Sequence, residues 1–378
     1  MKRNALVIAG FALLSTNAFA SKARVQAMGQ DAVRGSEYIA DSRNIFRNPA
    51  ALNETKNYLV TEWGGAVDSD TGAAPRAEGG FFREMGAFNY GVYLGNDGVN
   101  STTVNGTALT RSQAVGNFLA HDNALDLFLA GDMGVKWGAR VHYAGSKDEA
   151  TSAFEKKNTA IGVGLGVVAG AVEGYANVDI SDKSEGAALA NDEFKLKPSY
   201  IVGGSFTMND FTLFASYEAT KADVRLANVS TTIKTSEIVV GAGRTMEINP
   251  TARVFGDVQL NMTQNTNITA AGKTKNNTLP VTLGMEADAT SWLTLRGAVS
   301  QNVFLNQTKN AAGKKVTNAN STGVNAGATL NFGKLKVDGL IGTTPAARNA
   351  GTIAAGGTNQ GVLSTDNLMS RVAVSYWF

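Results

Sequence analysis

The last residues of the chain alternate between apolar side chains and polar or small ones. Successive side chains of a β-strand point to opposite faces, so this alternation predicts a strand with one apolar face. The strand ends on aromatic residues, which is rare in soluble proteins because their termini are usually exposed to water. In a membrane barrel, aromatic side chains gather at the membrane interface. The apolar phase is Val372, Val374, Tyr376 and Phe378, and the other phase is Arg371, Ala373 and Ser375.

The same alternation recurs upstream in about sixteen segments, and roughly 9–11 residues are enough for a tilted strand to cross a membrane. Clear examples are residues 87–94, 135–143, 172–180, 253–262, 281–286 and 324–330. A soluble β-sandwich alternates in the same way. The connections between the strands therefore have to distinguish the two architectures.

Short and long connections alternate along the whole chain. The short ones fall at residues 84–85, 132–133, 208–210, 247–249, 289–290 and 333–334, and the long polar ones at 67–74, 96–123, 147–156, 181–192, 223–231, 267–276, 306–320 and 343–367. A barrel with short periplasmic turns and long outer loops has this pattern, whereas a sandwich has no reason to place every long loop at one end. We therefore predict an all-β, transmembrane antiparallel up-and-down β-barrel of about 16 strands (range about 14–18) over residues 57–378, in the bacterial outer membrane.

Composition excludes several other classes of protein. The chain has no Cys and only two His, which excludes disulfides, thiol catalysis and Cys-ligated metals. The patterns Gly-x-Ser-x-Gly and His-Glu-x-x-His are absent, and His121-Asp122 and His142 are the only sources of imidazole. We therefore expect that the protein is not an enzyme and that it binds no cofactor.

The first twenty residues form a secretory signal peptide by pattern. Lys2 and Arg3 precede an apolar stretch that ends in Ala18-Phe19-Ala20, which predicts cleavage after Ala20. The chain that remains has 32 basic and 32 acidic residues. Such a balance leaves no basic surface for nucleic acid.

A glycine-rich segment matches a dinucleotide-binding pattern, Gly164-x-Gly166-x-x-Ala169. That motif needs a helix after it, yet another alternating segment follows. We interpret these glycines as one face of a barrel strand.

Residues 21–56 differ from the rest, because their charge density is higher and they do not alternate. They form either a periplasmic extension or a plug inside the barrel. The stretch Asn48-Pro49-Ala50 is open to two interpretations, a turn that leads into the first strand or part of such a plug.

Specific residues of this segment carry a family resemblance. The pattern Arg24-x-x-x-Met28-Gly29, the block at residues 38–50 and the following Asn57-Tyr58 resemble the mature N-terminus of the major outer-membrane porin of Bdellovibrio-type predatory bacteria. Residues 46–50 also resemble the N-terminal hatch of the long-chain fatty-acid transporter family. The first resemblance implies a passive porin, and the second a plugged transporter of hydrophobic compounds.

The C-terminal strand resembles that of bacterial outer-membrane barrels. In those proteins a terminal Phe is part of the signal that the barrel assembly machinery reads, which implies this role for Tyr376 and Phe378. The resemblance also implies outer-membrane lipid as a partner. A homotrimer is common in this architecture, but no residue of the sequence identifies one.

If the apolar phase of each strand faces lipid, the opposite phase lines the lumen. We predict a water-filled pore that passes small hydrophilic solutes and ions by passive diffusion, with a structural or host-contact barrel as a further alternative. The loop at residues 96–123 is unusually apolar, and it folds into the lumen, packs on its neighbours or contacts another subunit. The charged pore-lining candidates are Lys136, Arg140, His142, Glu173, Asp179, Lys195, Lys197, Glu218, Arg253, Asp257, Glu286, Asp288, Arg296 and Arg371.

Overall fold

The computed structural model describes residues 21–66, 77–96, 101–104, 107–112, 114–121, 123–149, 153–266, 272–309, 312–317, 322–343 and 368–378. Sixteen strands in this part of the chain pair edge to edge into one closed antiparallel barrel. The first strand, β1 (Tyr58–Ala66), closes the barrel on the last, β19 (Leu368–Trp377), with Tyr58 opposite Trp377. No helix among the described residues is long and apolar enough to span a membrane.

The other fourteen barrel strands follow in chain order. They are β2 (Glu78–Met85), β3 (Phe88–Leu94), β6 (Asn123–Asp132), β7 (Lys136–Asp148), β8 (Lys156–Ala169), β9 (Val172–Glu185), β10 (Glu193–Met208), β11 (Phe211–Leu226), β12 (Val229–Asn249), β13 (Ala252–Thr266), β14 (Lys273–Thr290), β15 (Leu293–Lys309), β17 (Thr322–Phe332) and β18 (Leu335–Thr343). Three short strands lie outside this ring: β4 (Ser101–Val104) pairs only with β5 (Thr107–Thr110), and β16 (Lys315–Thr317) adds to the end of β15.

This architecture confirms the predicted fold and strand number. Alternation sorts the side chains as expected: on β7, Val141 and Tyr143 are exposed on the outer face, while Arg140 and His142 are buried on the inner face. The terminal Tyr376 and Phe378 are about half exposed, and the Phe378 ring stacks on Phe81. An apolar exterior of this kind matches the hydrocarbon core of a membrane.

Where the structure describes the connections, they agree with the predicted pattern except in one place. The predicted loops at 67–74 and 343–367 lie outside the described residues, apart from Thr343. Short turns join the strands near the expected residues, and a further one follows β8 at Gly170. The predicted long loop at 223–231 is wrong. Strands β11 and β12 instead continue through it and meet at Ala227 and Asn228, both of which have positive φ. A two-residue turn with both residues in that region matches the twist of a hairpin, so the polar sequence here forms strand rather than loop.

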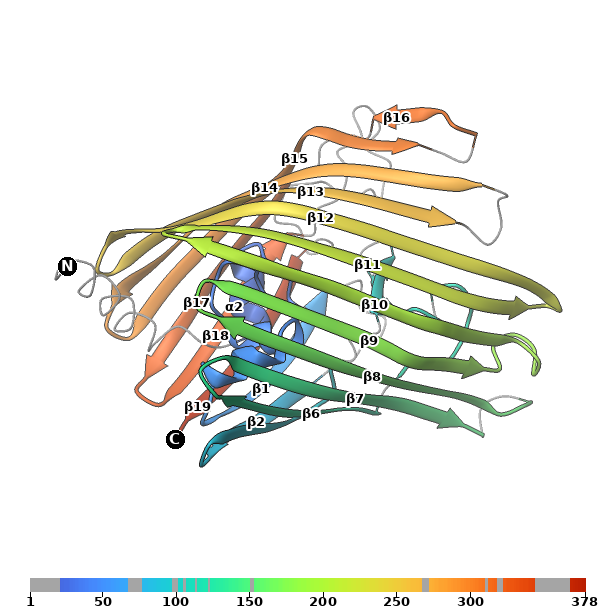
Figure 1. Cartoon of the computed structure of the whole chain (residues 1–378), viewed down its shortest axis with the longest axis horizontal. Coiled ribbons are helices and arrows are strands. Elements are labelled where there is room, and N and C mark those ends of the chain that lie inside the picture. Colours follow the sequence, from blue (N-terminus) through green and yellow to red (C-terminus); the bar gives the residue numbers. More distant parts are fainter. Residues whose placement is uncertain are drawn as a thin grey trace.

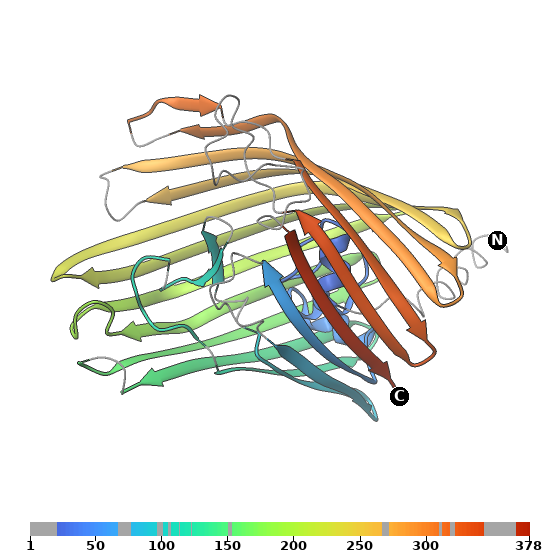
Figure 2. The ribbon, with the colours of Figure 1, turned by 180° about the vertical axis from the view of Figure 1, so that it is seen from behind.

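Residues 21–56 fold inside the barrel, toward the end where the C-terminus lies (Figures 1 and 2). The short helix α2 (Lys22–Ala27) packs against β15, β17, β18 and β19. Two 3₁₀ turns follow, η2 (Ser42–Phe46) and η3 (Pro49–Asn53), and η3 packs against β3, β6, β7 and β8. We call residues 21–56 the plug, and the inward faces of the strands the wall.

Glycines on the wall make room for the plug. A Cβ at Gly166 on β8 would lie 1.6 Å from Oδ1 of Asn48, and one at Gly138 on β7 would lie 2.3 Å from the Pro49 carbonyl carbon. Strand β8 pairs on both sides with β7 and β9, and another strand follows it. The interpretation of Gly164 and Gly166 as one face of a barrel strand is therefore confirmed.

Replacing Gly166 by Ala should loosen the plug without disturbing the barrel. Asn48 is fully buried and caps η3 by accepting a hydrogen bond from the Ala50 amide, so its side chain cannot simply turn away. We expect a cost of about 1–3 kcal/mol. The measurement is the temperature at which a protease begins to cleave residues 21–56 in detergent-solubilised protein, which should fall.

Gly174→Ala on the neighbouring strand is the matched control. A Cβ there would meet only Val167, at an ordinary 3.6 Å. Equal cleavage temperatures for the two variants would contradict the close fit of Asn48 against β8.

Candidate functional site

The interface between the plug and the wall is rich in buried charges. Arg24 and Arg43 of the plug are each about 1% exposed. Burying a charge is costly unless an opposite charge and hydrogen bonds accompany it. The partners of these two arginines therefore identify the groups that hold the plug in place.

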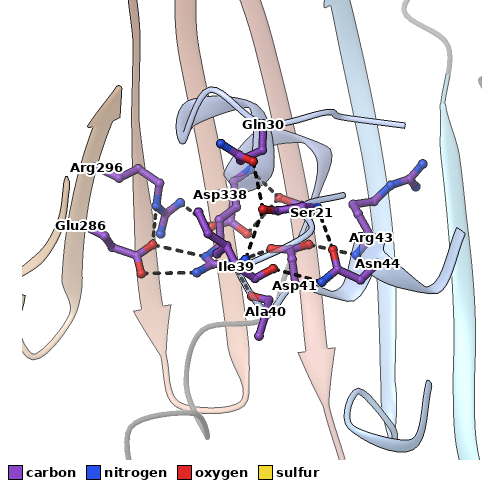
Figure 3. Close-up of polar contacts among 12 residues, drawn as sticks. Ser21, Gln30, Ile39, Ala40, Asp41, Arg43, Asn44, Glu286, Arg296 and Asp338 are labelled. Atoms are coloured by element: carbon purple, nitrogen blue, oxygen red, sulfur yellow. Dashed lines mark hydrogen bonds and ion pairs between the residues drawn. The ribbon is translucent and has the colours of Figure 1, made fainter. Parts of the chain in front are cut away.

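Arg24 docks helix α2 onto Glu286 of β14, the carboxylate that Figure 3 shows beside Arg296. Its Nε and Nη2 donate to the two carboxylate oxygens of Glu286, each at 3.3 Å, in the two-pronged geometry that suits guanidinium and carboxylate. Its Nη1 donates to Asp41 Oδ2 at 2.5 Å and to the Ala40 carbonyl at 3.2 Å. Arg24 thus joins two parts of the plug to the wall.

Glu286 is the centre of a larger network on the wall. Arg296 Nε of β15 donates to it at 2.9 Å, and Arg253 of β13 donates to its other oxygen. Arg296 continues to Asp338 of β18 at 3.2 Å, and Ser21 of the plug donates to the same aspartate at 3.2 Å. One carboxylate therefore faces three guanidinium groups, and a second carboxylate completes the cluster.

A second cluster lies on β1 and β2, where Glu62 and Glu78 face each other as register partners. Lys22 of the plug reaches both: its Nζ lies 2.5 Å from Glu78, and its backbone amide donates to Glu62 at 2.7 Å. Arg43 Nη1 lies 3.5 Å from Glu78 and 3.8 Å from Glu62, and donates to the Tyr93 hydroxyl at 3.0 Å. Burial lowers the pKa of Lys22, because the loss of hydration outweighs the attraction of the two glutamates.

Two further plug arginines meet glutamates on the opposite side of the wall. Arg34 Nη1 lies 3.0 Å from Glu218 of β11, and Arg47 Nη2 lies 2.8 Å from Glu173 of β9. The Arg47 carbonyl also accepts a hydrogen bond from Asn177 at 2.8 Å. The plug is consequently held from several directions.

Apolar packing fills the space between these ion pairs. Phe46 of η2 packs edge-on against Tyr93 and Phe128, with ring centroids 5.0 and 5.5 Å apart. The Arg43 guanidinium lies over the Phe46 ring at 4.0 Å. The plug is therefore a folded insert with its own packing against the wall.

The second outer connection also folds inward, as far as the structure describes it. Arg111 pairs with Asp179 of β9, and His121 Nε2 lies 3.3 Å from Asp182. Phe118 packs with Phe194 and Leu196 of β10 in an apolar cluster. Asp122, which the sequence pairs with His121, lies outside the described residues.

A cavity of about 100 Å³ lies between the plug and the wall at the end with the short turns. Its lining includes Arg24, Arg253, Glu286, Asp288 and Lys336. Such a space holds a few water molecules and has polar partners for them.

Most of the predicted lumen residues lie on the wall, but two do not. Lys195 and Lys197 lie on the face opposite Phe194 and Leu196, which pack inward, and Lys197 pairs with Asp223. A register shift between Lys197 and Tyr200 is the reason, since one extra residue exchanges the two faces of a strand. The wall residues are Lys136, Arg140, His142, Glu173, Asp179, Glu218, Arg253, Asp257, Glu286, Asp288, Arg296 and Arg371.

The structure brings several of these residues together. Arg253, Arg296 and Glu286 form one cluster, and Arg140 and His142 meet at Asp126. Lys136 reaches Glu54 of the plug, and Arg371 donates to Gln26. Asp257 accepts from Tyr38 and Gln30 of the plug.

The predicted site residues did not include the plug arginines, Asp126 and Asp338, or the pair Glu62 and Glu78. The signals available were the high charge density of residues 21–56 and the position of Glu62 in the polar phase of the first strand. No group of three or more His, Asp or Glu residues within the described ranges is placed to hold a metal ion.

Solved structures that align with the chain include a FadL homologue, a toluene transporter and a porin. A FadL homologue of Pseudomonas aeruginosa aligns with a TM-score of 0.45 and 11% identity, over 94% of this chain and 98% of that one. The toluene transporter TodX of P. putida aligns at 0.38 and 12%, over 89% and 94%. A porin aligns at 0.39 and 11%, over 85% and 99%.

No protein-family model and no curated protein sequence matches the chain. The resemblance to the porin of Bdellovibrio-type bacteria stays a prediction. The closed barrel with its apolar exterior is a membrane β-barrel of the bacterial outer membrane.

Removing the carboxylate of Glu286 should destabilise the protein strongly. Glu286→Ala removes the anion shared by the buried Arg24 and Arg296 and the half-buried Arg253, at an expected cost of about 3–5 kcal/mol. The measurement is the free energy of unfolding in urea, followed by tryptophan fluorescence in lipid vesicles. Asp288→Ala is the control, because Asp288 is exposed on the same strand and accepts a hydrogen bond from Thr294. A difference below about 1 kcal/mol between the two variants would refute the central role of Glu286.

Proposed function

We propose that the protein is an outer-membrane channel for small hydrophilic solutes and ions whose lumen the plug closes. The observation that carries this proposal is the plug, which occupies the lumen. Ion pairs with the wall hold it there, and such non-covalent contacts can exchange for other partners. A barrel of about sixteen strands is too wide for its own side chains to fill. Passage therefore requires the plug to shift within the barrel or to leave it.

The polarity of the wall supports a hydrophilic solute. Beyond Asp257, strand β13 continues its inward phase with Gln259, Asn261 and Thr263, and Thr263 donates to Glu237 of β12. Such a surface offers hydrogen bonds to water and to polar solutes, and gives little affinity for apolar ones.

Deleting residues 22–52 should open the channel. In a planar lipid bilayer we expect the deletion variant to give ohmic steps of the order of a nanosiemens, because the lumen is then empty. The intact protein should open more rarely and more briefly. A deletion variant that is folded by circular dichroism but electrically silent would refute the channel, and equal open times for both proteins would refute closure by the plug.

A point variant separates loosening of the plug from its loss. Arg24→Ala with Arg43→Ala removes two anchors, so the intact-length chain should open several-fold more often. Arg244→Ala is the control, since Arg244 contacts Asp210 and Phe211 away from the plug. Equal opening by the double variant and the control would count against the anchors.

One observation favours a second function, transport of hydrophobic compounds. Phe118, Phe194, Leu196, Ala222 and Val224 form an apolar cluster against the inside of the barrel. A silent deletion variant that binds fatty acids tightly would support this second candidate in place of the first.

A further inference from the structure

Basic side chains of the plug contact glutamates on the wall. Each of five basic side chains of the plug contacts a wall glutamate, and these glutamates come from five strands spread around the barrel. The contacts are Lys22 with Glu78, Arg24 with Glu286, Arg34 with Glu218, Arg43 with Glu62 and Glu78, and Arg47 with Glu173.

Several basic residues of the wall are already paired with wall carboxylates. Arg140 Nε lies 2.6 Å from Asp126, and Arg296 and Arg253 both contact Glu286. These pairs do not involve the plug, so they persist when it moves. These wall cations are therefore not free to pair with further glutamates when the plug leaves.

Among the described residues outside the plug, Arg371 and Arg111 also lie near these glutamates. Arg371 lies close to Glu62 and Glu78, and its guanidinium donates to the Gly64 carbonyl of β1 and to Gln26, which leaves with the plug. Arg111 lies 3.9 Å from Glu218 while pairing with Asp179. An open lumen consequently carries an excess of negative charge at the level of the plug.

Among these glutamates, Glu62 and Glu78 most need a cation beside them. Like charges directly opposite each other on adjacent strands are destabilising, and both side chains here are almost fully buried. The Lys22 ammonium contacts Glu78, and the Arg43 guanidinium lies near both carboxylates. The groups that bind these two glutamates are thus an ammonium and a guanidinium, and both belong to the chain itself.

We propose that the open channel selects cations, and that solutes carrying ammonium or guanidinium groups replace Lys22 and Arg43 at Glu62 and Glu78. The proposal rests on the channel function above and names its solute class. Exchange of one cation for another keeps both carboxylates paired while the plug leaves. Departure without exchange would expose two opposed carboxylates that have lost both plug cations. Cationic solutes therefore favour opening as well as passage.

The selectivity is tested on the deletion variant that lacks residues 22–52. Its reversal potential in a potassium chloride gradient should have the sign of a cation-selective pore. Glu62→Gln with Glu78→Gln in the same background should move it toward zero, and this background contains neither Lys22 nor Arg43 to be left unpaired. Glu84→Gln is the control, because Glu84 pairs with Lys56 in an exposed position and should leave the potential unchanged.

An anion-selective or unselective deletion variant overturns the proposal, and so does a potential that Glu62→Gln with Glu78→Gln leaves unchanged. Absence of any conductance is a different outcome, since it refutes the channel itself. If the Gln pair fails to fold, Glu173→Gln with Glu218→Gln gives the same test at two of the other three wall glutamates.

Opening is tested on the intact chain with L-arginine and L-glutamate as probes at equal millimolar concentrations. L-Arginine should raise the opening frequency several-fold, and L-glutamate should not. Equal effects of the two amino acids would contradict displacement of the plug by cations.

Discussion

A closed sixteen-strand barrel encloses more space than its own side chains can fill, and the rest of the structure follows from this constraint. The chain fills one end of the space with its own residues 21–56. Those residues carry six basic and four acidic side chains. Burying these charges in the lumen is costly unless opposite charges lie beside them. The glutamates of the wall satisfy that condition, and the glycines on β7 and β8 give the plug backbone room to approach.

The contacts of the plug are of a kind that can be broken one at a time. Ion pairs between a plug residue and a wall residue exchange for water or for a charged solute, whereas Phe46 packs against Tyr93 and Phe128 in an apolar cluster that resists water. The barrel is continuous without the plug, since each strand pairs with two neighbours. The plug can therefore move without loss of the sheet, which separates the stability of the wall from the state of the lumen.

Strand alternation was enough to predict the fold, the number of strands and most of the inward-facing charges. Alternation gave the wrong face for Lys195 and Lys197. The bulge after Lys197 shifts the inward-facing positions by one residue, and the alternating pattern does not reveal a bulge. It also failed at residues 223–231, where polarity resembled that of a loop. The partners of Arg24 and Arg43 could not be predicted, because Glu286 lies 262 residues from Arg24 and only closure of the barrel brings them together.

The central claim is that the plug must move for solutes to pass, and a reversible tether tests it most directly. The chain has no Cys, so a new pair has no competing thiols. A Cβ at position 327 would lie 2.6 Å from Ala27 Cβ, and a disulfide between Ala27→Cys and Gly327→Cys needs a shift of only about 1 Å. The oxidised variant should be closed in a planar bilayer, a reducing agent should restore its openings, and neither single variant should respond. Full conductance of the oxidised, cross-linked protein would contradict closure of the lumen by the plug.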